Sequence, residues 1–342
     1  MICLQSKLKI INRKEDNMLL SIIIPFYNPM PYFDDLLKSL EKQDLSEVEI
    51  VFVNDGSTDN YDVILSSFLK KHSCAKIITT TNGGVSRAKN IGLKNSCGDY
   101  VWFVDADDMI DINAIENIVK RIKYYRMKAD IIFSNFKGFN DQSVSVEYTS
   151  NYDYERYFTD VFDIHQNKDD IIDILFSKLK ITYAIWYQIF QRAFLIKNNI
   201  FFDEKMPVSE DLDYKFSTLT QARYIGYLSQ NIYIYRLPSS SRNSLSVKKR
   251  TADEIMIILN MDLKWYNYFK NNYEHESGKQ LMLNRFAFFT YLHYNFIKSH
   301  SETPNTQKQI SEKDDLINNI LVSNSAYIKQ AYNGLKKGNI VL

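Results

Sequence analysis

Residues 19–135 alternate short apolar runs, rich in β-branched residues, with longer stretches of helical periodicity. The runs predict strands at 20–24, 49–53, 76–80, 100–104 and 130–134. Helices are predicted between them, near 31–43, 59–71, 84–95 and 112–125. This alternation is typical of a parallel sheet covered by helices. We therefore expect an α/β fold whose functional groups follow the carboxyl ends of the strands.

Composition limits the functions of such a fold. The 342 residues include 42 Lys or Arg and 41 Asp or Glu, and a net charge of +1 gives no broad attraction to nucleic acid. Three cysteines, Cys3, Cys74 and Cys97, fit neither a disulfide framework nor a metal clip and favour a reducing cytoplasm. The purest apolar run, 19–27, is far shorter than the roughly 20 residues that span a bilayer. We expect neither a membrane span nor a signal peptide.

An acidic turn follows the predicted strand at 100–104. It reads Asp105-Ala106-Asp107-Asp108, and strand alternation would direct Asp105 and Asp107 to the same side. Two carboxylates that converge at a strand end suit Mg²⁺ or Mn²⁺, with phosphate oxygens completing the coordination. The alternative is a solvated turn whose acids cap the next helix.

Three further strand ends carry polar or glycine-rich motifs. The first strand leads into Pro25-Phe26-Tyr27-Asn28, and the second into Asn54-Asp55-Gly56-Ser57. The third leads into 82–92, where two glycines at a helix start offer free N–H groups to an anion. The alternative for 54–57 is an ordinary turn with a helix cap, and the alternative for 82–92 is a loop that glycine permits, with solvated basic residues.

In this order the four motifs resemble those of the family 2 glycosyltransferases, over about residues 19–240. The resemblance implies the GT-A nucleotide-diphospho-sugar transferase fold, a mainly parallel sheet flanked by helices, here with a helical C-terminal extension. It implies that Asp55 accepts a base N–H and that Asp105 and Asp107 hold Mn²⁺ or Mg²⁺. The nucleotide-sugar site it implies consists of Pro25, Tyr27, Asn28, Asp55, Ser57, Gly84, Lys89, Asp105, Ala106, Arg236 and Ser240. The family more often has Arg where this chain has Lys89.

A second acidic segment, 201–213, resembles the Glu-Asp motif of the same family, in which the second residue is the general base. The resemblance assigns that role to Asp211. An inverting transfer needs a carboxylate on the acceptor side, and this base cannot be one of the metal ligands. The resemblance places Glu210 and Trp186 at the acceptor. The alternatives are a surface acidic turn before a helix near residue 212, and core packing for Trp186.

A later segment resembles the family's Tyr-Arg-x-x-x-x-Ser loop, which closes over the diphosphate. Arg236 suits phosphate because its planar donors can hold two oxygens at once. Ser240 lies in a serine run that suits a lid, although a mobile surface loop is the alternative.

The domain organisation follows from changes of pattern along the chain. We expect an N-terminal extension at 1–17 and a glycosyltransferase domain at 18–245, divided into a nucleotide-binding half, 18–135, and an acceptor half, 136–245. A helical region is expected at 246–342, since apolar residues recur there at helical spacing. Its basic and aromatic residues fit contact with an anionic membrane surface, core packing or a dimer face.

The sequence thus predicts an inverting, metal-dependent enzyme that moves one glucose, galactose or N-acetylhexosamine from a UDP-sugar to a saccharide. The resemblance suggests an O-antigen or capsule repeat unit on a polyprenyl diphosphate carrier, at the cytoplasmic face of the inner membrane. A processive synthase is disfavoured because the Gln-x-x-Arg-Trp motif is missing. Two rivals are a catalytically silent binding subunit and a sugar-phosphate nucleotidylyltransferase. The second would need a Gly-rich, Arg-containing loop, which does not follow Ile24.

Overall fold

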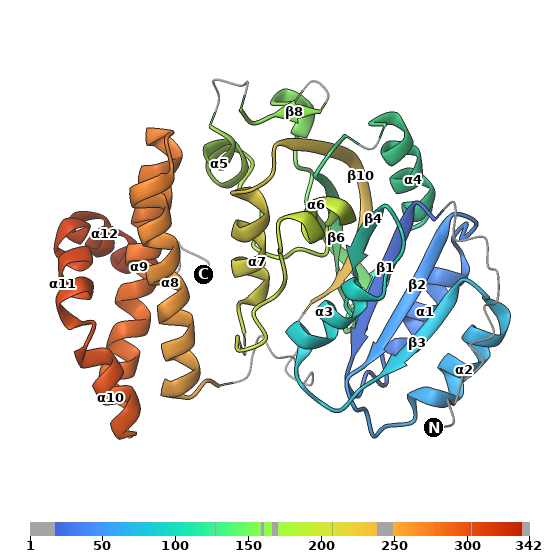
Figure 1. Ribbon diagram of the computed structural model, residues 1–342, viewed down its shortest axis with the longest axis horizontal. Coiled ribbons are helices and arrows are strands. Elements are labelled where there is room, and N and C mark those ends of the chain that lie inside the picture. The colour runs from blue at the N-terminus through green and yellow to red at the C-terminus, as the bar shows by residue number, and fades with distance from the viewer. Residues whose placement is uncertain are drawn as a thin grey trace, which may run out of the picture.

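The structure, a computed structural model, describes seven stretches of the chain (Figure 1): 18–126, 128–158, 161–165, 170–206, 208–237, 249–301 and 303–336. The predicted extension at 1–17 and the predicted site residue Ser240 lie outside these stretches.

A parallel four-stranded sheet forms the first half, as predicted. Its strands are β1 (Leu20–Phe26), β2 (Val48–Asn54), β3 (Ala75–Thr79) and β4 (Tyr100–Phe103), in the spatial order β3-β2-β1-β4. All residues of β1, β2 and β4 are buried, as expected for continuous apolar strands covered on both faces. The carboxyl ends of these strands carry the predicted motifs.

Helices cover both faces of this sheet. They are α1 (Phe33–Glu41), α2 (Tyr61–Lys71), α3 (Val85–Lys94) and α4 (Ala114–Tyr124). Helix α3 packs on β1 and β2, and Gly92 permits this contact, since a Cβ atom there would lie 2.2 Å from Ile23 Cγ2. Lys89 lies one turn earlier on the same helix, and this close packing of α3 on the sheet buries it.

The second half of the sheet is mixed and contains the strand predicted at 130–134, but its antiparallel pairing was not predicted. The order continues from β4 to β9 (Gln188–Gln191), β6 (Ile131–Asn140), β10 (Tyr224–Arg236) and β5 (Met109–Ile110). Strand β9 runs antiparallel to both its neighbours, whereas β10 is parallel to β6. Strand β7 (Ser145–Thr149) pairs with β6 beside the site, and β8 (Phe162–Asp163) pairs with the start of β10. Three short helical segments and one longer helix complete this half: η2 (Tyr154–Arg156), α5 with η3 (Ile171–Asp173, Ile174–Lys178), α6 (Arg192–Lys197) and α7 (Glu210–Leu219).

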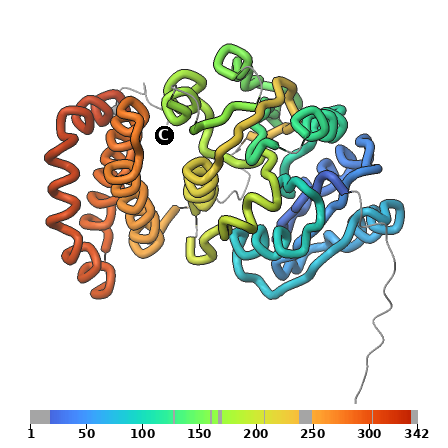
Figure 2. Tube along the Cα trace, turned by 45° about the horizontal axis from the view of Figure 1, so that its top comes forward, coloured from blue at the N-terminus to red at the C-terminus, as the bar shows by residue number. Residues whose placement is uncertain are grey.

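The C-terminal region is helical, as predicted. It comprises α8 (Ala252–Asn272), α9 (Glu276–His300), α10 (Pro304–Ser311), α11 (Asp314–Ser323) and α12 (Ser325–Lys336). Figures 1 and 2 show these helices as a layer beside α7 and α5, on the side away from β1–β3. Phe216 of α7 joins the layers, because its ring centroid lies 5.4–5.5 Å from those of Trp265, Phe269 and Phe286.

This packing bears on the aromatic residues of the C-terminal helices. Trp265, Tyr266, Phe269, Phe286 and Phe288 are all buried inside the protein, which favours the packing alternative for them. In the stretches that the structure describes, no helix combines the length and the apolar character that crossing a bilayer requires.

Candidate active site

The acidic turn after β4 is held in place by β10. The backbone N–H of Asp105 donates to the hydroxyl of Tyr233 at 3.1 Å, and that hydroxyl donates to Asp108 Oδ2 at 2.7 Å. Asp108 is buried, and its other oxygen accepts the backbone N–H of Arg236 at 2.7 Å. The turn therefore presents Asp105 and Asp107 at the site and uses Asp108 as an anchor. The sequence analysis gave neither Asp108 nor Tyr233 a role.

The electrostatics of this turn favour a bound cation. Burial, opposed by the charge of Lys89 and assisted by the nearby carboxylates, raises the pKa of Asp105 to about 7. Burial and the charge of Asp107 also raise the pKa of Asp108 well above its ordinary range. Within the described stretches, no three acidic, histidine or cysteine side chains converge into a complete metal cage. Two carboxylates fit Mg²⁺ or Mn²⁺ only where substrate oxygens complete the coordination, as a diphosphate would.

Arg236, predicted to hold the diphosphate, is bound to protein groups. Its Nε donates to the carbonyl of Asp107 at 2.8 Å, and its terminal nitrogens pair with Asp35 at 2.8 Å and with Asp141. The side chain is buried, and the guanidinium lies 4.7 Å from the ring centroid of Tyr32. A diphosphate contact would require these acids to release it. In this arrangement Arg236 supports the backbone of the acidic turn instead.

Lys89 connects the sheet to the second acidic segment. Its Nζ lies 2.8 Å from Asp211 Oδ1 and 3.2 Å from Glu210 Oε1, although 122 residues separate Lys89 from Asp211. Burial alone would lower the pKa of Lys89, but the charges of Asp211 and Glu210 raise it above the ordinary value. The ammonium therefore stays charged. The structure places Lys89 at the predicted base, while the resemblance placed it in the nucleotide-sugar site.

The second acidic segment forms the start of α7, as predicted within two residues. Ser209 precedes the helix in a left-handed conformation, with φ of 64°, and Glu210 and Asp211 follow in the first turn. Carboxylates are favourable there because of the helix dipole. Asp213, two residues on, points the other way and accepts hydrogen bonds from Lys264 and from Trp265 Nε1, each at 2.7 Å.

The strand ends of β1 and β2 form one polar cluster. Asp55, which is buried, accepts the backbone N–H groups of Gly83 and Gly84 through its two oxygens, each at 2.8 Å. The Asn28 N–H donates to the Ser57 hydroxyl at 2.9 Å, which joins the two loops. Gly84 has φ of +91°, a conformation that other residues rarely adopt. The structure therefore brings Asn28, Asp55, Ser57 and Gly84 together, as the sequence predicted.

Tyr27 and Pro25 occupy different environments in this cluster. Tyr27 is 54% exposed at the end of β1, so its ring is available to pack on a base. Pro25 lies within buried β1, opposite Val53 of β2. Ala106, between the two aspartates of the turn, is buried as well.

Trp186 is an interior residue. Only 6% of it is exposed, and its ring stacks between those of Tyr233 and Tyr235, with centroid distances of 4.5 and 5.2 Å. This is the packing alternative, and the stack supports the tyrosine that holds the acidic turn. The Tyr-Ile-Tyr alternation at 233–235 places both tyrosines on one face of β10, a signal available in the sequence.

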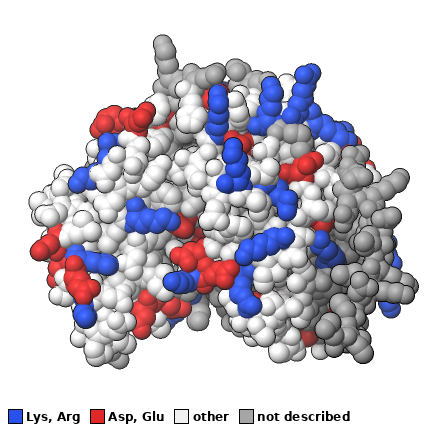
Figure 3. Space-filling model, viewed as in Figure 1, with Lys and Arg blue, Asp and Glu red and all other residues white. Residues whose placement is uncertain are grey.

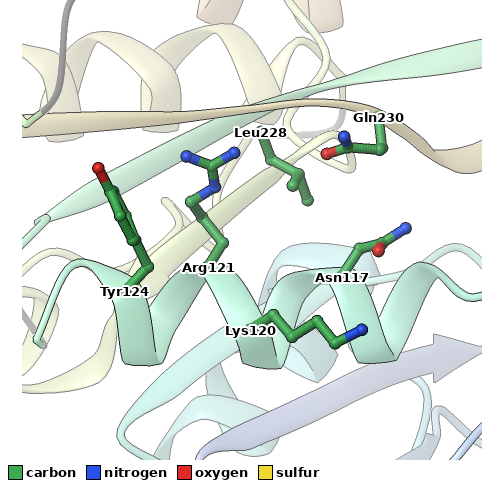
Figure 4. Close-up of a pocket in the computed structure, with 6 residues that line it drawn as sticks. All are labelled: Asn117, Lys120, Arg121, Tyr124, Leu228 and Gln230. Atoms are coloured by element: carbon green, nitrogen blue, oxygen red, sulfur yellow. The ribbon is translucent and has the colours of Figure 1, made fainter.

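A separate groove contains none of the predicted site residues (Figure 4). It has a volume of about 520 Å³ and lies between α4 and β10, lined by Asn117, Lys120, Arg121, Tyr124, Leu228 and Gln230. The face in Figure 3 carries small groups of both charge signs without one dominant field, in keeping with the net charge of +1.

Comparison with known proteins decides the family. Residues 21–184 match the sequence model of the family described as "Glycosyl transferase family 2". This part of the chain is a family 2 glycosyltransferase domain. This confirms both the resemblance stated for the sequence and the expected enzyme class.

Bacterial relatives and a solved structure agree with that membership. "Uncharacterized glycosyltransferase EpsJ" of Bacillus subtilis (strain 168) is 26% identical over 73% of this chain and 70% of EpsJ. TarS of Staphylococcus aureus (strain Mu50 / ATCC 700699), a poly(ribitol-phosphate) beta-N-acetylglucosaminyltransferase, is 28% identical over 72% of this chain and 42% of TarS. This chain thus spans less than half of the length of TarS. The crystal structure of S. aureus TarS 1–349 in complex with UDP-GlcNAc is similar with a TM-score of 0.64 at 22% identity, over 95% of this chain and 93% of that one. That similarity confirms the fold.

Proposed function

We propose that this protein transfers a single sugar from a UDP-sugar to a hydroxyl of a bacterial surface saccharide or polyol-phosphate polymer, with inversion at the anomeric carbon. The observation that carries the proposal is the ion pair between Lys89 and Asp211. The charges of Lys89 and Asp211 both act on Asp105 of the acidic turn after β4, which supports a single site formed by carboxylates from two distant segments. A silent binding subunit would not need this arrangement.

Each group has a role that its position supports. Asp55 and Tyr27 would bind the base, since the carboxylate accepts hydrogen bonds and the exposed ring can stack. Asp105 and Asp107 would hold Mg²⁺ or Mn²⁺, which when bound neutralises the charge of the leaving diphosphate. Lys89 adds a fixed positive charge at the same place.

Asp211 would accept the proton of the attacking hydroxyl. Its carboxylate is partly exposed, at the first turn of α7, and the Lys89 ammonium keeps it oriented. The ionised carboxylate can take the proton as the acceptor oxygen attacks the anomeric carbon. UDP would leave on the opposite side, toward Asp105 and Asp107.

The donor and acceptor are proposed by class. TarS was crystallised with UDP-GlcNAc, and TarS and the minor teichoic acid biosynthesis protein GgaB of Bacillus subtilis (strain 168) act in cell-surface polymer synthesis by their names. They support a UDP-sugar donor and a hydroxyl-rich polymer or its lipid-linked precursor, met at the cytoplasmic face of the membrane. We also retain the division into domains at 18–245 and 246–342 as a proposal.

The test is UDP release from UDP-glucose, UDP-galactose and UDP-N-acetylglucosamine, with Mg²⁺ or Mn²⁺, with and without polymer extract. We expect release from at least one donor, lost on chelation and in Asp107→Asn. Asp62→Asn is the matched control, because Asp62 is an exposed acid in the first turn of α2. If the wild-type protein releases UDP from none of the three donors under either condition, the transferase assignment is wrong for these substrates.

A further inference from the structure

An aromatic face begins at the acidic turn and continues outward across β6 and β7. Tyr233 and Phe136 are register partners on β10 and β6, and Tyr235 and Tyr148 flank Gly138 from β10 and β7. Residues opposite one another in a sheet direct their side chains to the same side. The contacts agree, because the Phe136 ring centroid lies 4.6 Å from that of Trp186 and 6.0 Å from that of Tyr148.

Tyr148 is the exposed end of this face. It is 42% exposed, whereas Trp186 and Phe136 are buried. Gly138 makes room for it, since a Cβ atom at 138 would lie 2.3 Å from Tyr148 Cε1. Burial and the charge of Asp108 raise the pKa of Tyr148, which places its hydroxyl within electrostatic reach of the acidic turn. Tyr148 thus presents an accessible ring beside the site.

Tyr148 lies on a different part of the sheet from the residues proposed to bind the nucleotide. Tyr27, Asp55 and Gly84 follow β1, β2 and β3, on one side of β4, and β6, β7 and β10 lie on the other side. The acidic turn at the end of β4 therefore stands between the two groups. A ligand on Tyr148 would approach the turn from the side opposite to the base.

We infer that Tyr148 is a specificity residue that binds a pyranose ring of the acceptor, an inference that rests on the proposed function. One face of a pyranose presents C–H groups, which are apolar and pack on an aromatic ring, while its hydroxyls can bond the phenol oxygen. A tyrosine supplies both contacts on one side chain. Binding sites combine such aromatic surfaces with a few polar groups.

The test uses saturation-transfer NMR on the full chain with UDP and Mg²⁺. The probes are the methyl β-glycosides of glucose, galactose and N-acetylglucosamine. We expect at least one glycoside to receive saturation at its ring protons, and Tyr148→Ala to raise its dissociation constant about 3- to 10-fold. Tyr148→Phe keeps the aromatic face and should retain most of the binding. Tyr124→Ala, which removes another exposed tyrosine, 65% exposed on α4, should bind as the wild type does.

The uridine protons of UDP serve as an internal control in the same spectra. They should receive saturation equally in the wild type and in Tyr148→Ala. The inference is overturned if no glycoside binds the wild type, if Tyr148→Ala binds as tightly as the wild type, or if that variant loses the uridine signals too. Failure of the proposed function has a different signature, because the wild-type protein would then release no UDP from the three UDP-sugars, whatever the NMR spectra show.

Discussion

The two acidic turns of this glycosyltransferase come from different parts of the chain, but in each of them two acids lie at the site and one is buried as an anchor. One follows β4 and the other begins α7, and in each the third acid faces inward. Asp108 anchors β10 through Tyr233 and the Arg236 backbone. Asp213 anchors α8 through Lys264 and Trp265.

The comparison shows that one short acidic segment can carry both chemistry and architecture. Of the acids at the site, Glu210 and Asp211 contact Lys89, whereas the inward acids accept hydrogen bonds from a distant element. Substitutions of neighbouring acids should therefore have different effects. Substitution of an acid at the site should lower activity, and substitution of an inward acid should lower stability.

The largest effect is expected for Asp211→Asn. Loss of the base should lower kcat/KM for transfer about 10²- to 10⁴-fold, while thermal unfolding changes little because Glu210 remains beside Lys89. Radiolabelled sugar transfer to the acceptor and calorimetry measure the two quantities. A full loss of activity in Asp213→Asn, with stability intact, would reverse the assignment of these two acids.

Lys89→Met should destabilise the protein by about 2–3 kcal/mol. The substitution leaves Asp211 and Glu210 without their cation, and the value lies below that for a fully buried pair because both acids keep some exposure. Urea unfolding measures the free energy. Lys89→Arg keeps the charge and is the control, and equal stability of Lys89→Met and the wild type would show that the ion pair contributes nothing.

Asp213→Asn should cost about 1–3 kcal/mol of unfolding free energy, since it replaces the charged acceptor shared by Lys264 and Trp265 with a neutral amide oxygen. UDP release should persist. Lys264→Met removes only the half-exposed partner and should cost less. A Tm unchanged in Asp213→Asn would contradict the anchoring role.

A dependence on pH is expected for Lys215, which lies one turn beyond Asp211 on α7 and contrasts with Lys89. Lys215 is buried and donates to the Thr182 carbonyl and the Tyr187 hydroxyl, each at 2.6 Å. Burial lowers its pKa well below 10.5, so the folded protein binds fewer protons than the unfolded chain between the two pKa values. Its contribution to stability should therefore rise with pH through that window, by at most about 1.4 kcal/mol per unit.

Urea unfolding of the wild type and Lys215→Met, from pH 7 to 10, checks this expectation. The difference in unfolding free energy should shift in favour of the wild type as the pH rises. A difference independent of pH would mean that Lys215 stays protonated in the folded protein.

The sequence predicted the sheet of the first half because its strands are continuous apolar runs between helical segments. It also predicted that Asn28, Asp55, Ser57 and Gly84 meet, since parallel strands end at one edge. Strand β7 was not predicted, although its residues alternate between polar and apolar, because all five are at least partly exposed and none belongs to the buried core. Strand β9 is only four residues long.

The side-chain partners could not be read from local pattern. Asp105, Asp107 and Asp108 look alike in the sequence, and only β10 decides which of them faces inward. Likewise, Lys89 stands in a motif that suggests phosphate, while its partners lie 121 and 122 residues away. Local spacing carries no information about such a contact, because tertiary packing determines it.

The paired hydrogen bonds at Asp55 have a consequence for which nucleotides this enzyme accepts. The two carboxylate oxygens already accept hydrogen bonds from two peptide N–H groups. An ionised carboxylate accepts hydrogen bonds and donates none. Uracil presents an N–H at ring position 3, whereas cytosine presents a lone pair there. Under the role proposed for Asp55, cytidine donors would meet repulsion at the atom where uridine donors gain a bond.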